Sequence, residues 1–291
     1  MKRILVLSGK GGTGKTTLTA TLVQMLQIKA FADCDVDAPN LHLICAKKEW
    51  EREDKPFLGM QISFIDQDKC TGCGKCVEVC RFDALVKTAT GTYQVNPFNC
   101  EGCAVCQYVC PENAISSKDN ITGKTSVYTH EDTVFSTAQL NMGSGNSGKL
   151  VSEVKKNLDD AVPKNEGIAI IDGSPGIGCP VIASLSGIDL ALMVTEPTSS
   201  GLHDLKRIVK TSKIFATKIA IVINKSDIDE EGCQLVEAYC QEEHLPIIGH
   251  IPYDSTVSKT INKGENLADI DCPSSKAIGK IAEKIPSFLE K

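Results

Sequence analysis

The sequence predicts an α/β fold in which helices cover both faces of a mainly parallel sheet, with a small α+β domain inserted into it. Short apolar runs alternate with amphipathic segments along most of the 291 residues, which is typical of parallel strands joined by helices. Between residues 59 and 118 this pattern gives way to two cysteine-rich repeats. We therefore expect one discontinuous domain, 1–58 with 119–291, and an inserted domain, 59–118.

The first predicted element is an apolar strand at residues 4–7, followed by a glycine-rich loop and a helix-like segment. Residues 9–16 fit G-x-x-x-x-G-K-[ST], the P-loop pattern, whose backbone N–H groups surround phosphate oxygens. Lys15 should reach the β and γ phosphates, and the Thr16 hydroxyl should bind magnesium. The glycines also fit the dinucleotide fingerprint G-x-G-x-x-G, but the Lys15-Thr16 pair that follows favours the P-loop. The predicted phosphate-binding residues are Gly9, Lys10, Gly11, Gly12, Thr13, Gly14, Lys15, Thr16 and Thr17.

A second glycine–lysine match lies at residues 143–149. Leu150 follows it, so the hydroxyl that binds magnesium is missing. The polar run 143–148 is instead expected to be a loop before a helix that begins near Ser147.

The predicted insertion carries eight of the fourteen cysteines, in two runs spaced C-x2-C-x2-C-x3-C. This spacing is typical of ferredoxins with two [4Fe–4S] clusters, in which the fourth cysteine of each run binds the other cluster. Zinc is the alternative, but it usually takes two C-x2-C pairs separated by a longer spacer. The predicted ligands are Cys70, Cys73, Cys76 and Cys110 for one cluster, and Cys80, Cys100, Cys103 and Cys106 for the other.

Each cysteine run is flanked by short segments that predict a duplicated strand–cluster–helix unit. The preceding segments are 62–65 and 93–96, and the following ones are 84–86 and 114–115. Arg81 follows Cys80 where ferredoxins commonly have proline, a change that leaves the predicted ligands intact.

Further apolar strands are predicted at 167–172, 188–195 and 219–224, with an amphipathic helix at 202–214. In parallel sheets phosphates bind at the carboxyl ends of the strands. Asp33, Asp35 and Asp37 follow the second strand, and Asp172 ends another. Carboxylates beside a phosphate site repel one another unless a cation lies between them, so magnesium is expected there.

The composition of the chain limits the kinds of partner that the protein is expected to bind. Hydrophobic residues make up 42% of the chain and the net charge is −6, so no nucleic-acid partner is expected. No apolar run approaches the ~20 residues that span a bilayer, and the apolar start is too short for a signal peptide. We expect a cytoplasmic protein without membrane contact, in which cysteines bind metal rather than form disulfides.

A C-terminal helix is predicted at residues 277–289. One face is apolar and lysines lie opposite, so the helix is expected to pack on the sheet rather than on a membrane. The apolar face consists of Ile278, Ile281, Ala282, Ile285 and Leu289.

Seven stretches taken in order resemble the MinD/ParA/Mrp group of P-loop ATPases, which have a deviant Walker A loop. These are KGGTGKTT, DCDVDAPNLHL, the cysteine block, DGSPGIGCP, TEPTSSGLHDLKR, INKSD and IPYDSTV, and they cover nearly the whole chain. The chain most closely resembles the MinD-like ATPases with an inserted ferredoxin domain.

The resemblance implies a role for the extra lysine of the loop. In that group the residue matching Lys10 contacts phosphate bound to a partner subunit, so ATP is enclosed between two chains. An arginine finger has the same role in other enzymes, because it places a positive charge on the phosphate bound to another chain. The implied assembly is a nucleotide-dependent homodimer, or a heterodimer with a related ATPase.

The resemblance also assigns the remaining nucleotide-site residues. Asp35 is expected to orient or deprotonate the attacking water, while Lys15 and Lys10 offset charge on the γ-phosphoryl group. Asp172 is expected to hold magnesium through a water, with Asp33 supporting the same shell as Thr16. The NKSD stretch matches a guanine-selecting motif, but similar ATPases carry an asparagine there, so ATP is expected. The expected base-contacting residues are Asn224, Asp227, Pro252 and Tyr253.

Three functions fit these expectations. The first is an ATPase that couples nucleotide state and dimerisation to electron transfer through the clusters, to an unidentified redox or iron–sulfur partner. The second is an iron–sulfur cluster carrier of the Mrp type, although the C-x-x-C pair such carriers have near their C-terminus is represented here only by Cys272. The third is a MinD-like positional switch that recruits partners. Cys179, near the place of a cluster-ligating cysteine in the nitrogenase iron protein, is expected to be a buried or interfacial thiol.

Overall fold

The computed structural model describes residues 1–162 and 167–290. The chain divides into two units. Unit 1 comprises Met1–Lys55, Thr125–Gln139 and Ser147–Lys291, and unit 2 comprises Pro56–Lys124 and Leu140–Asn146. The predicted insertion, 59–118, lies within unit 2.

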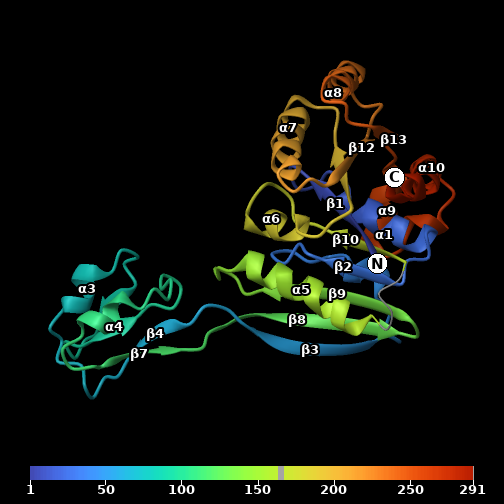
Figure 1. Cartoon of the computed structure of the whole chain (residues 1–291). Helices are drawn as coiled ribbons and strands as arrows, with labels where there is room; N and C mark the ends of the chain where they lie inside the picture. Colours follow the sequence, from blue (N-terminus) through green and yellow to red (C-terminus); the bar gives the residue numbers. More distant parts are fainter. Residues whose placement is uncertain (163–166, 291) are drawn as a thin grey trace. The chain divides into compact units, whose positions relative to one another are not determined.

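Nine strands of the described residues form one sheet, in the order β13-β12-β11-β1-β10-β2-β9-β8-β3 (Figure 1). Every neighbouring pair from β13 to β9 is parallel, so the predicted parallel sheet is confirmed. The strands are β1 (Lys2–Ser8), β2 (Ala30–Asp33), β3 (Glu51–Leu58), β8 (Ile121–His130), β9 (Thr133–Leu140), β10 (Ile168–Asp172), β11 (Leu190–Thr195), β12 (Lys218–Asn224) and β13 (Ile247–Ile251).

Helices cover both faces of the parallel part of this sheet (Figure 1). The helices α1 (Lys15–Met25), α9 (Ser255–Asn262) and α10 (Pro273–Glu290) lie on one side, and α5 (Ser147–Ala161), α6 (Cys179–Leu185) and α7 (Ser199–Lys213) on the other. All six residues of β11 are buried, because a strand covered on both faces has no solvated side. The remaining helices of unit 1 are α2 (His42–Cys45), α8 (Glu230–Glu242) and the short 3₁₀ helix Leu267–Asp269.

The helices predicted after the P-loop and at residues 202–214 are α1 and α7, and two further predicted helices are confirmed. The helix α5 begins at Ser147, after the polar loop that resembles a second P-loop. The five apolar residues predicted to face the sheet from α10 are all buried, and Pro286 lies inside the helix. Within the described residues, no helix is both long and apolar enough to cross a membrane.

Unit 2 is built from two similar halves. The strands β4 (Ile62–Ile65) and β7 (Ile115–Lys118) pair antiparallel, as do β5 (Leu85–Lys87) and β6 (Tyr93–Val95). The strands β4 and β6 match the segments expected before each cysteine run, and β5 and β7 show that the short apolar segments after the runs are strands as well. The helices α3 (Lys75–Val79) and α4 (Val105–Val109) carry the third cysteine of each run.

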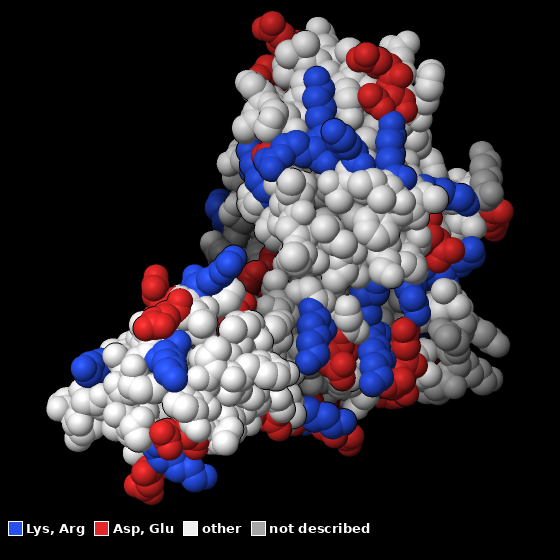
Figure 2. Space-filling view, turned by 60° about the vertical axis from the view of Figure 1, so that its left-hand side comes forward, with Lys and Arg blue, Asp and Glu red and all other residues white. Residues whose placement is uncertain are grey.

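Charge is unevenly distributed over the helices of unit 1. Figure 2 shows basic side chains gathered across the upper part of the view, over α7, and acidic ones at the top, where α8 lies in Figure 1. Both Glu230 and Glu231 occupy the first turn of α8, where carboxylates stabilise the positive end of the helix dipole. The outer part of α8 is therefore acidic.

Candidate nucleotide site and cysteine cavities

The glycine-rich loop joins β1 to α1 and contacts Asn224, the last residue of β12. Gly14 has φ 87° and caps α1 in the left-handed conformation. This φ favours glycine, and a Cβ built on Gly14 would lie 2.3 Å from Nδ2 of Asn224 and displace that amide. The Asn224 amide uses this proximity to donate to the Thr13 carbonyl oxygen at 2.7 Å.

Lys15 is buried at the start of α1 and points to the end of β10. Its Nζ lies 3.2 Å from Asp172 Oδ1, and the Thr16 hydroxyl donates to Asp172 Oδ2 at 2.6 Å. Burial disfavours the ammonium, but the carboxylates of Asp172, Asp35 and Asp33 outweigh burial and raise the pKa of Lys15. The structure thus brings together the lysine, the hydroxyl and the acidic groups predicted to handle phosphate and magnesium.

Asp33 is fully buried and organises the loop that carries Asp35. Its Oδ1 accepts the Asp35 N–H at 3.0 Å, and its Oδ2 accepts the N–H groups of Asn40 and Leu41. Burial, and then the charge of Asp172, raise the pKa of Asp33 to about 7. Burial is also the main cause that raises the pKa of Asp35. The crowded carboxylates make this place electrostatically favourable for a divalent cation.

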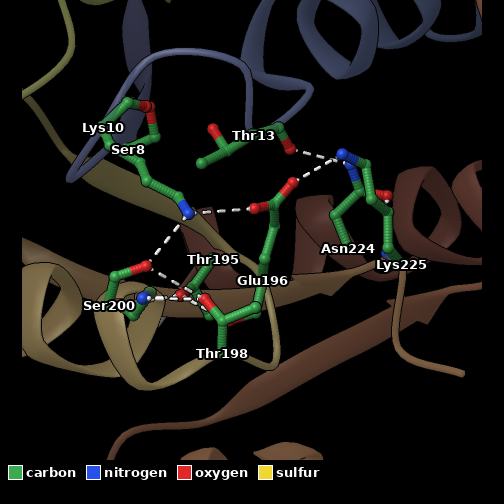
Figure 3. A network of polar contacts seen from close by, with 10 residues as sticks. Ser8, Lys10, Thr13, Thr195, Glu196, Thr198, Ser200, Asn224 and Lys225 are labelled. Carbon is green, nitrogen blue, oxygen red and sulfur yellow. Dashed lines mark hydrogen bonds and ion pairs between the residues drawn. The ribbon is translucent and has the colours of Figure 1, made fainter. Parts of the chain in front are cut away.

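Lys10 contacts its own chain (Figure 3). Its Nζ lies 3.2 Å from Glu196 Oε2 and donates to the Ser200 hydroxyl at 3.2 Å. The other Glu196 oxygen is 2.6 Å from Lys225 Nζ. Burial opposes ionisation of Glu196, but the two lysines outweigh it and lower the pKa of that carboxyl. One carboxylate therefore holds two cations beside the loop.

A cavity of about 250 Å³ lies beside the glycine loop. It is lined by residues from the P-loop and by three of the predicted base-contacting residues, Asn224, Pro252 and Tyr253. Asp227, the fourth, is not among its lining residues, and its Oδ1 accepts the Tyr253 N–H at 2.6 Å. Asp227 thus positions the loop that borders the cavity.

Unit 2 contains two small cavities, each lined by four cysteines drawn from both runs. One is lined by Cys70, Cys73, Cys76 and Cys110, and the other by Cys80, Cys100, Cys103 and Cys106. These are the two predicted ligand sets, with the fourth cysteine of each run at the other cavity. All eight cysteines are free thiols.

Backbone and hydroxyl groups contact the sulfurs of these cavities. The Ser63 hydroxyl lies 3.2 Å from Cys106 Sγ, and the Ser63 N–H is 3.5 Å from Cys100 Sγ. At the other cavity, the Ala114 N–H is 3.3 Å from Cys110 Sγ. Four sulfurs around one hollow, with donors directed at them, match the donor set of an iron–sulfur cluster.

Sequence reasoning missed Glu196 and Ser63. Glu196 directly follows β11, at the carboxyl ends of the strands, where the other site residues also lie. That position in the sequence could have indicated that Glu196 belongs to the site. Ser63 is a short polar residue inside an apolar strand, which gave no comparable signal. Cys179 is exposed at the start of α6, so the expectation of a buried thiol is wrong and the interfacial alternative stays a prediction.

The parallel sheet, the glycine loop on α1 and the buried lysine define a P-loop nucleotide-binding protein. Residues 4–267 match the model of the CobQ/CobB/MinD/ParA nucleotide binding domain, and the chain belongs to this family. It is a MinD/ParA-type member of the P-loop ATPases.

Individual relatives and a solved structure support the assignment of the chain to this family. The Methanocaldococcus jannaschii protein MJ0578 is 33% identical over 99% of this chain and 97% of its own length. An iron-sulfur cluster carrier protein of the same organism is 23% identical over 99% of this chain and 85% of its own length. The septum site-determining protein MinD of Pyrococcus horikoshii, solved with Mg-ADP, shares the fold with a TM-score of 0.58 and 18% identity, covering 98% and 95% of the two chains.

Proposed function

We propose that this protein hydrolyses ATP in a nucleotide-dependent dimer and couples that cycle to electron transfer through two [4Fe–4S] clusters in unit 2. The observation that carries the proposal is the pair of four-cysteine cavities, each drawn from both runs, in a chain whose other unit has a P-loop. Electron transfer explains why two such centres lie in one unit, because neighbouring clusters can pass electrons between them.

ATP is favoured over GTP by the contacts of the NKSD stretch. In guanine-selecting proteins this motif offers its aspartate to the base. Here the Asp227 carboxylate instead accepts the Tyr253 N–H, and the Asn224 amide donates to the P-loop. A base in the neighbouring cavity would meet Pro252 and Tyr253.

Hydrolysis requires that water attack the γ-phosphorus while the bond to the bridging oxygen of the β-phosphate breaks. Asp35 orients the water, and its raised pKa suits a group that accepts a proton. Lys15 offsets charge on the transferred group. Thr16 and Asp172 would hold Mg²⁺, whose charge favours the leaving phosphate, and Asp33 fixes the loop of Asp35 through backbone hydrogen bonds.

Dimerisation would move Lys10 from one carboxylate to a phosphate. In the isolated chain Glu196 and Ser200 hold the Lys10 ammonium. Contact with nucleotide in a partner requires that this ion pair break and that a stronger attraction, to the triphosphate, replace it. Nucleotide occupancy and assembly are coupled by this exchange.

The clusters would be held by the two cysteine sets described above, and when bound they accept and release single electrons. The hydroxyl and N–H of Ser63 contact sulfurs of one set, and the Ala114 N–H contacts a sulfur of the other. Donors of this kind stabilise the more negative, reduced state of a cluster.

A second candidate function is cluster delivery, favoured by the relatives named iron-sulfur cluster carrier proteins, such as that of Pyrococcus furiosus at 25% identity. Delivery requires ligands that can release a cluster. Cys272 is buried and has no C-x-x-C partner nearby in the sequence, so we place electron transfer first.

Anaerobic EPR of the reduced protein, with and without Mg-ATP, tests the proposal. We expect two interacting [4Fe–4S] signals, and a change in cluster potential or in the rate of electron delivery when ATP binds. Intact movement of clusters to an apo-ferredoxin would favour delivery instead. Partner recruitment under ATP control, with neither redox change nor transfer, would favour a positional switch.

A further inference from the structure

We propose that Cys233, Glu237 and His250 form a binding site for one Zn²⁺ ion on the acidic helix α8, separate from the nucleotide site and from the cysteine cavities. No step of the proposed ATPase or electron-transfer function uses these three side chains. Their donor atoms, one thiol sulfur, one carboxylate oxygen and one imidazole nitrogen, all lie within 4.8 Å of one another.

The backbone brings the three donors together from two elements. Cys233 and Glu237 are four residues apart on α8, so they project from the same face of the helix. Their sulfur and oxygen atoms are 3.9 Å apart. His250 comes from β13, the edge strand of the sheet, and its Nε2 lies 2.8 Å from Glu237 Oε1. Glu237 is thus the centre of the cluster and contacts both other donors.

These distances are close to those that zinc requires. Zinc bonds of about 2.0–2.3 Å in a tetrahedron place neighbouring donor atoms roughly 3.3–3.7 Å apart. The two separations that involve Glu237, 2.8 Å and 3.9 Å, lie on either side of that range, and the third, between Cys233 and His250, is within 4.8 Å. Small rotations of the exposed Glu237 and His250 side chains would meet it, while α8 and β13 stay in place.

The chemical types of the three ligands indicate which metal ion the site would bind. Thiolate and imidazole together favour zinc over magnesium or calcium, which prefer oxygen ligands. Three protein ligands leave a fourth tetrahedral position for water or for a group from another molecule.

The surroundings also favour a cation. The carboxylates of Glu237, Asp229 and Glu230 all act on the Cys233 sulfur. Their combined negative charge favours a dication at this place.

The test uses the full chain, purified anaerobically with its clusters loaded, so that the cluster cysteines are occupied. Zinc is titrated against a competing chelator, and the zinc environment is read by X-ray absorption. We expect one tightly bound equivalent with a single sulfur neighbour and nitrogen or oxygen neighbours.

Two variants and two controls locate the site. Cys233→Ser and His250→Ala should each weaken zinc binding by at least the roughly 10–100-fold that changes around a metal site commonly cost. The controls replace an exposed cysteine and an exposed histidine elsewhere, as Cys179→Ser and His244→Asn, and should bind zinc like the unaltered chain. Equal affinity in all five proteins, or a bound zinc with several sulfur neighbours, would overturn the proposal.

Discussion

Replacing Glu196 by glutamine removes the carboxylate charge that holds Lys10 in its own chain. We expect this variant to dimerise more strongly with Mg-ATP than the unaltered protein does. The reason is a competition: Lys10 cannot pair with Glu196 and reach a partner's phosphate at once. Glutamine keeps the size of the side chain and still offers an oxygen to Lys225.

The size of the effect follows from the exposure of the ion pair. Lys10 Nζ lies 3.2 Å from Glu196 Oε2, and the lysine side chain is 34% exposed. An ion pair at that exposure contributes about 1 kcal/mol at most. A homodimer breaks two such pairs, so the variant should gain up to about 2 kcal/mol, which corresponds to a dimer Kd lower by as much as roughly thirtyfold.

Sedimentation equilibrium measures this Kd, in a background of Asp35→Asn so that ATP persists. Glu243→Gln serves as the matched control, because that carboxylate pairs with Lys213 away from the loop and its loss should leave the Kd unchanged. Lys10→Ala should abolish the dimer. A Glu196→Gln dimer that is weaker than the unaltered one, or equal to it, would refute the competition.

Three further predictions concern other parts of the molecule. Gly14→Ala should abolish ADP binding, measured by calorimetry, because Gly14 has a left-handed φ and its Cβ would meet a neighbouring amide. Gly279→Ala in α10, where a Cβ meets nothing within 4 Å, is the control and should retain binding. The pKa of Asp33 is raised to about 7. Between pH 4 and 7 the folded apo-protein therefore keeps a proton on Asp33 that the unfolded chain loses, so the contribution of Asp33 to the free energy of unfolding should fall as the pH rises from about 4 to about 7. Urea unfolding across that range should show a smaller decline in Asp33→Asn, and an unchanged decline would contradict the assignment. Ser63→Ala should lower the reduction potential of one cluster in an EPR redox titration. Ser117→Ala, which changes the residue paired with Ser63 across the sheet, should leave both potentials unchanged. Equal potentials in the two variants would show that the Ser63 contact does not affect the cluster.

The parallel half of the fold could be predicted because its strands are buried on both faces. The apolar runs at β1, β10, β11 and β12 are continuous, and each was located from that signal alone. The strand β3 was not predicted, since its first six residues are all exposed and its sequence begins with five charged residues. The stacking of Phe31 on Phe135, with ring centroids 4.8 Å apart, depends on a pairing across about a hundred residues that no local pattern encodes.

At the candidate site, residues that belong to a motif of set spacing could be predicted. Residues that only the tertiary structure brings to the site could not. The glycine loop places Lys15 and Thr16 at set offsets, and the cysteine runs do the same for each set of four. The position of Lys10 could not be inferred in this way. The resemblance suggested a contact with a partner subunit, whereas the isolated chain pairs it with Glu196, a residue 186 positions away that tertiary structure alone brings close.

The chain leaves the sheet along β3 and returns to it along β8, and these two strands are adjacent. The Gly59 N–H donates to the Asn120 carbonyl oxygen at 3.0 Å, so the two ends of the intervening segment meet. A segment whose ends touch can be exchanged for a short turn, because closing the gap costs little chain entropy. The cysteine-rich segment between β3 and β8 therefore has the form of an insertion into a β-hairpin, which adds a unit without changing the strand order of the ATPase sheet.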